Sequence, residues 1–128
     1  GCYDWSFAQG LLKAVAECVV ENAPVLFVAY DLPIPGPIGK VRLTRDTFGC
    51  GFVLLPDLGQ NGICTLDVSH MSKTVMHDEV SCPQLAEFAC ANPAARGLAL
   101  LQRIASGQAG AVSLASQPGS LLVGVQPC

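Results

Sequence analysis

Apolar residues cover nearly the whole circumference of the helix that residues 5–20 predict. The few polar positions of this helically periodic segment are Ser6, Gln9, Lys13 and Glu17. A helix that is apolar almost all round is typical of a buried position rather than a surface one. After the break at Pro24, residues 25–30 form a continuous apolar run of strand length, typical of a central strand covered on both faces. A buried helix followed by a buried strand indicates an α/β fold.

The middle of the chain predicts an antiparallel hairpin. Its candidate strands are residues 47–55 and 62–69, and the connection over residues 56–62 contains Pro-Asp and Asn-Gly steps, which are typical turn chemistry. Gly49 and Gly51 both lie within the first of these strands. Glycines at such positions predict either a β-bulge or the close approach of another backbone.

The last half of the chain predicts two helices and two further strands. Residues 71–81 are polar and mixed, which favours a loop. After Pro83, apolar residues recur at helical spacing up to Asn92-Pro93, which predicts a helix. A second helix is predicted over residues 94–106, and Gly107 directly after it is a stop signal. Strands at residues 111–115 and 120–125 flank a turn. The predicted order is α, β, β, β, α, α, β, β, in one domain that spans residues 1–128.

Composition excludes several classes of function. Only 13% of the 128 residues are charged and 51% are hydrophobic, so the chain carries about half the charge of an ordinary soluble domain. The net charge is −3 and no basic patch is present, which argues against a nucleic-acid-binding protein. No apolar run approaches the roughly 20 residues of a membrane helix. A soluble domain with so little charge is expected to bury part of its surface against a partner.

The seven cysteines favour a reducing compartment. None of them is spaced as CxxC, most lie in apolar runs, and their number is odd. These features are typical of reduced core thiols in a cytoplasmic protein. The start of the chain has no signal-peptide pattern, so a signal peptide is either absent or already removed, and the expected location depends on the cysteines. A secreted, disulfide-linked binding domain is the alternative that the cysteine count leaves open.

Few residues suggest chemistry by their pattern. No phosphate-binding loop, dinucleotide fingerprint, zinc-protease motif or nucleophile elbow occurs. Two histidines lie near three carboxylates, but their spacing favours surface or capping roles, and no metal site is predicted. These residues are His70, His77, Asp67, Asp78 and Glu79. Cys2 directly precedes the first helix, where the helix dipole favours a thiolate, so it is the one candidate nucleophile.

Two blocks of sequence carry a family resemblance. The string YDWSFAQGLLKA, residues 3–14, and the string PVLFVAYD, residues 24–31, occur in this order and spacing. They resemble the β-ketoacyl synthase-like family with a ketosynthase N-terminal domain, which includes chain-length-factor-like proteins of aryl polyene pathways. The resemblance is strong over the first thirty residues and weaker afterwards. It implies a thiolase-like, layered α/β/α fold with a mixed sheet, in which the helix carrying Phe7 and Leu11 is central.

The resemblance also implies a function in fatty-acid or polyketide-type chain building. In active members the acyl-accepting cysteine lies at the start of this helix, close to the place of Cys2, and works with two histidines. Here the usual small residues around that cysteine are missing, Tyr3-Asp4-Trp5 follows it, and neither His70 nor His77 corresponds to the family pair. The expectation is therefore a catalytically incomplete subunit that pairs with an active ketosynthase.

The alternative within the same family is an active β-ketoacyl-acyl-carrier-protein synthase that uses Cys2 for thioester exchange. Either reading implies an acyl carrier protein or an active ketosynthase as partner, and no cofactor, because this chemistry runs on thioesters. Family members have about a hundred residues before this helix, so the chain is expected to be an N-terminally short version of the domain. Apolar surface would then be left uncovered, which predicts a homo- or hetero-oligomer.

Overall fold

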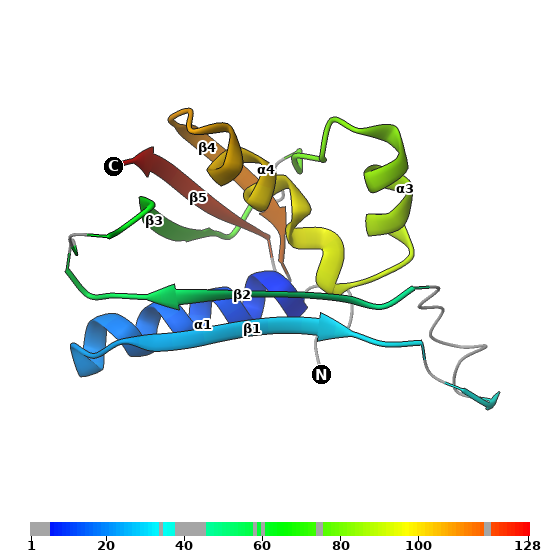
Figure 1. Ribbon diagram of the computed structural model, residues 1–128, viewed down its shortest axis with the longest axis horizontal. Helices are drawn as coiled ribbons and strands as arrows, with labels where there is room; N and C mark the ends of the chain where they lie inside the picture. The colour runs from blue at the N-terminus through cyan, green and yellow to red at the C-terminus, as the bar shows by residue number, and fades with distance from the viewer. Residues whose placement is uncertain are drawn as a thin grey trace.

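The computed structural model describes residues 6–33, 35–37, 46–57, 59, 61–73, 76–116 and 119–128. Cys2 lies outside these residues. The elements follow one another in the predicted order: α1 Ser6–Glu21, β1 Val25–Asp31, β2 Phe48–Leu54, β3 Cys64–Met71, α3 Pro83–Cys90, the 3-10 helix η2 Ala94–Gly97, α4 Leu98–Ser106, β4 Gly110–Ala115 and β5 Ser120–Pro127 (Figure 1). The mixed α and β class is confirmed.

Helix α1 buries one face rather than its whole circumference. Its buried residues follow helical spacing and are Phe7, Ala8, Leu11, Ala14 and Cys18. Val19 and Val20 in the last turn remain 67% and 79% exposed. The prediction of an all-round buried helix is therefore wrong for this turn, because an apolar residue reaches the core only where another element lies beside it.

Strands β1 and β2 form a two-stranded antiparallel ribbon. Their register runs from Val25 opposite Leu54 to Asp31 opposite Phe48 without interruption, so the expected bulge does not occur. Phe27 points inward and is buried, whereas Leu26 on the other face is 67% exposed. The expectation of a strand covered on both faces is wrong, because an apolar run alone does not distinguish a covered strand from one with a bare face.

The second sheet has the strand order β3-β5-β4. Strand β2 pairs with β1 and strand β3 pairs with β5, so the predicted hairpin between residues 47–55 and 62–69 is wrong. The two strands predicted on either side of a turn are confirmed as β4 and β5, which pair antiparallel with Leu114 opposite Leu121. Every strand pair among the described residues is antiparallel, so the mixed sheet does not form in this part of the chain.

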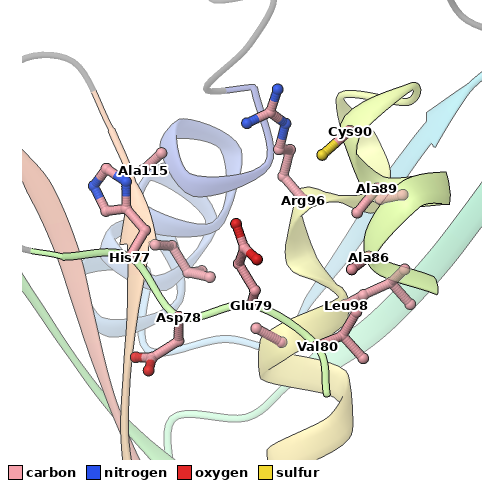
Figure 2. Close-up of a pocket in the computed structure, with 13 residues that line it drawn as sticks. His77, Asp78, Glu79, Val80, Ala86, Ala89, Cys90, Arg96, Leu98 and Ala115 are labelled. Carbon is pink, nitrogen blue, oxygen red and sulfur yellow. The ribbon is translucent and has the colours of Figure 1, made fainter. Parts of the chain in front are cut away.

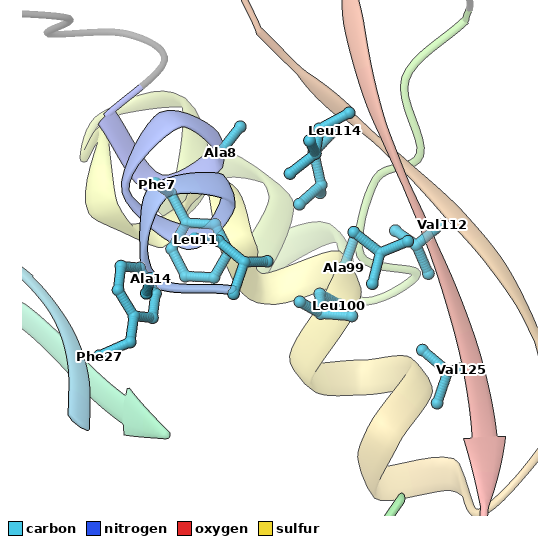
Figure 3. Close-up of a cluster of buried hydrophobic side chains, with 12 residues drawn as sticks. Phe7, Ala8, Leu11, Ala14, Phe27, Ala99, Leu100, Val112, Leu114 and Val125 are labelled. Carbon is cyan, nitrogen blue, oxygen red and sulfur yellow. The ribbon is translucent and has the colours of Figure 1, made fainter. Parts of the chain in front are cut away.

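One hydrophobic core joins both sheets through α1. The helix contacts β1 and β2 on one side and β3 on another, and α4 contacts β4 and β5. Leu11, Leu100 and Leu121 are fully buried at the centre. Figure 3 shows Phe7 and Leu11 of α1 lying between Phe27 of β1 and the side chains of α4, β4 and β5. The rings of Phe7 and Phe27 meet edge to face with centroids 5.5 Å apart.

The predicted helix over residues 94–106 is divided into η2 and α4. Gly107 ends it with a positive φ of 68°, as the sequence predicts. Within η2, Gly97 leaves room for the ring of Phe7, since a Cβ atom there would lie 2.3 Å from two ring carbons. No helix among the described residues is long and apolar enough to cross a membrane.

Candidate functional site

A hollow of about 130 Å³ lies between the segment at residues 77–80, helix α3, the η2–α4 turn and strand β4 (Figure 2). Its walls are mostly apolar and include Val80, Leu98 and Leu114. A volume of this size accommodates a few water molecules or a small organic group. The polar residues that line it are His77, Asp78, Glu79, Cys90 and Arg96.

Asp78 attaches this segment to β4. The backbone N–H of Asp78 donates to the carbonyl oxygen of Ser113 over 2.9 Å. In return, the backbone N–H of Ser113 donates to Oδ2 of Asp78 over 2.7 Å. The carboxylate therefore satisfies a strand donor and points away from Glu79 (Figure 2). Asp78 has a structural role, and the hydroxyl of Ser113 is buried without a hydrogen-bond partner among the described residues.

The two histidines lie beside consecutive residues at the start of β5, Ser120 and Leu121. His77 Nε2 lies 3.2 Å from the hydroxyl oxygen of Ser120, and its ring is partly buried. His70 is exposed on β3, opposite Leu121 in the register. Within the described ranges, no three His, Cys, Asp or Glu side chains are grouped closely enough to hold a metal ion. Asp67, the third carboxylate singled out from the sequence, lies on β3 opposite Gly124, away from the hollow at residues 77–80.

The rim of the hollow carries opposite charges from two sides of the fold. Glu79 comes from the segment beside β4, and Arg96 comes from η2. Cys90 at the end of α3 and His77 lie on opposite sides of the hollow in Figure 2. A thiol activated by an imidazole requires hydrogen-bond contact between the two groups, and this arrangement does not bring them together.

A cluster that the sequence analysis missed caps the start of η2. Asn92, which is buried, donates from Nδ2 to the carbonyl oxygen of Asp46 over 2.7 Å. Its Oδ1 accepts hydrogen bonds from the N–H groups of Ala94 and Ala95. Asp31 Oδ2 also accepts from Ala94 N–H, over 2.9 Å, which ties the end of β1 to η2. The available signal was Asn before Pro at the start of a predicted helix, which is a typical capping pattern.

The six described cysteines are free thiols: Cys18, Cys50, Cys64, Cys82, Cys90 and Cys128. Burial raises the pKa of Cys50 above its ordinary value, and a backbone hydrogen bond from Ala29 partly opposes this. Burial also raises the pKa of Cys64, with a smaller contribution from the nearby thiol of Cys128. Both shifts lower the thiolate fraction at neutral pH, so neither thiol is an activated nucleophile.

Comparison of the chain with protein-family models, curated proteins and solved structures gives no significant match.

Proposed function

We propose that this chain is a ketosynthase-like subunit of fatty-acid or polyketide-type biosynthesis, and that it acts as a catalytically incomplete partner of an active ketosynthase. The observation that carries this proposal is the position of α1. The helix that bears the family-like string contacts both sheets and contributes Phe7 and Leu11 to the centre of the core. A central helix is what the thiolase-like, layered architecture requires of this segment, and that architecture is part of the proposal.

The roles of the histidines support a non-catalytic subunit. An active condensing site needs two histidines directed at an acyl-accepting thiol. His77 instead shares a hydrogen bond with Ser120, and the neighbouring Asp78 is bonded to the backbone of β4. These side chains serve the attachment of the segment to the sheet, which leaves the acyl-transfer step to a partner enzyme.

The thiols support the cytoplasmic location that the proposal includes. Cys18 is buried and Cys50 packs against the hydrophobic core, both as free thiols, as expected of small hydrophobic residues in a reducing compartment. A count of free thiols with a chromogenic disulfide reagent in denaturant tests this point. Most of the seven cysteines should react, whereas fewer than two reactive thiols would favour the disulfide-linked binding domain.

A condensation assay tests the proposed function. The chain is incubated with malonyl- and acyl-loaded acyl carrier protein, alone and together with an active ketosynthase from the same organism, and the β-ketoacyl products are identified by mass. We expect no product from the chain alone, co-elution with the ketosynthase, and a changed distribution of product chain lengths. Condensation by the chain alone would replace the proposal with the active synthase. No co-elution and no effect on the products would overturn it.

A further inference from the structure

The outer face of the β1–β2 ribbon is bare and apolar. The inner face packs against α1 through Phe27 and its neighbours. On the outer face, large apolar side chains of both strands, and of the residue that follows each strand, are half or more exposed: Leu26 67%, Val28 53%, Tyr30 67%, Leu32 53%, Val53 69% and Leu55 50%. The acidic residue of β1, Asp31, belongs to the inward set and binds the N–H of Ala94. The outward positions of the ribbon therefore carry no charge.

This face has a ridge beside a trough. Its large side chains on β1 form the ridge, whereas β2 places Gly51 opposite Val28 and Gly49 opposite Tyr30. Neither glycine has a positive φ. A Cβ atom at Gly49 would lie 3.6 Å from the Cβ of Tyr30, and one at Gly51 would lie 3.7 Å from Val28 Cγ2 and 3.4 Å from the carbonyl oxygen of Phe27. These are ordinary contacts, so the fold of one copy does not require glycine at either position.

We propose that a second copy of this chain docks face to face on the ribbon, with the ridge of each copy in the trough of the other. A two-fold axis parallel to the strands exchanges the positions of β1 and β2. It therefore places Tyr30 of each copy over Gly49 of the other, and Val28 over Gly51. A two-fold interface must be self-complementary, and Val28 and Tyr30 beside a trough of two glycines satisfy this condition, while Leu26 of each copy meets Val53 of the other. In this dimer, Gly49 and Gly51 allow the side chains and backbone of the second copy to approach closely.

The exposed area agrees with a dimer of modest strength. The six apolar side chains present roughly 600 Å² per copy, so a dimer would bury about 1,200 Å² in total, at the lower end of specific interfaces. The absence of charge on the outward positions means that no charged group must be desolvated when the faces meet. We therefore expect a dissociation constant on the order of micromolar.

Sedimentation velocity of the 128-residue chain over a concentration range of about 1 to 200 μM tests the dimer. Tyr30→Ser shortens the ridge, and Gly49→Ala fills the trough without a clash inside one copy. Each should raise the dissociation constant at least about tenfold, since a central tyrosine is a typical interface anchor. Gly124→Ala on β5 is the matched control, because a Cβ atom there meets Asp67 Cβ at the same 3.6 Å, but on the other sheet.

A monomeric chain at all concentrations would overturn the proposal, as would a dimer that both variants leave unchanged. Circular dichroism verifies the fold of each variant, and if one of them unfolds, the other decides. A monomer that binds an active ketosynthase through this face would also overturn it and assign the face to that enzyme. The dimer does not depend on the proposed function, which the condensation assay tests separately.

Discussion

Gly97→Ala should destabilise the protein even though alanine favours helices. Gly97 is buried in η2, and a Cβ atom there would lie 2.3 Å from Cε2 and Cζ of Phe7 and 2.6 Å from Cδ2. The ring cannot rotate away freely, because it is 2% exposed and meets Phe27 edge to face. Overpacking of this kind costs about 1–3 kcal/mol, whereas the gain in helix propensity is at most about 1 kcal/mol. We expect a net loss of about 1–2 kcal/mol.

Urea unfolding followed by circular dichroism measures this loss, which corresponds to a fall in Tm of roughly 3–10 °C for a chain of this size. Phe7→Leu removes Cε2 and Cζ, the two ring carbons that lie nearest to the new Cβ, at a cost of about 1 kcal/mol by itself. The double variant Phe7→Leu/Gly97→Ala should therefore be more stable than the sum of the single effects by about 1 kcal/mol or more.

Gly107→Ala is the control for this cycle. The substitution is the same, but no atom lies within 4 Å of the new Cβ, and the loss of about 1 kcal/mol arises from the positive φ of 68°. Phe7→Leu should not rescue it. If Gly97→Ala changes the unfolding free energy by less than about 0.5 kcal/mol, or if its effect adds to that of Phe7→Leu, the contact between α1 and η2 is not as described.

Three further predictions concern hydrogen bonds and thiols. Asn92→Ala should lower the unfolding free energy by about 1–2 kcal/mol, because it removes three hydrogen bonds of a buried amide and takes the Nδ2 donor from the carbonyl oxygen of Asp46, whereas the N–H of Ala94 keeps Asp31 Oδ2 and that of Ala95 keeps the backbone carbonyl oxygen of residue 92; an unchanged urea midpoint would contradict this. Asp78→Ala should cost about 1–2 kcal/mol and speed hydrogen exchange at the Ser113 amide, whereas Asp78→Asn, which keeps an acceptor, should cost less. Because burial raises the pKa of Cys50 and Cys64 above the ordinary 9.0, the unfolded chain loses these protons first, so Tm should fall as the pH rises from about 8 to 10; Cys50→Val should reduce that fall.

The order of the elements could be predicted from local patterns, but the pairing of the strands could not. The end of helix α4 at Gly107 and the turn from β4 into β5 could be predicted, because these features depend on residues close in sequence. Strand β2 instead pairs with β1, although a turn-rich segment joins it to β3. Such a choice depends on packing against α1 and on contacts between distant segments, which turn residues do not encode.

Only part of the candidate site could be predicted from the sequence. His77, Asp78 and Glu79 were singled out together, and the structure places them at one hollow. Arg96 and Cys90 join them from other elements, and no spacing along the chain connects these positions to the first three. The bonding of Asp78 to the β4 backbone also required the fold, because it depends on an irregular segment lying beside a strand edge.

The most direct test of a catalytically incomplete subunit is the alkylation rate of Cys2. The native protein is treated with iodoacetamide at neutral pH, and the modified cysteines are located by peptide mass over time. Cys90 and Cys128 are exposed and serve as internal references. The proposed function predicts that Cys2 reacts no faster than these two thiols. Rapid, selective labelling of Cys2 would reveal an activated thiolate and would contradict the account in favour of an acyl-transferring enzyme.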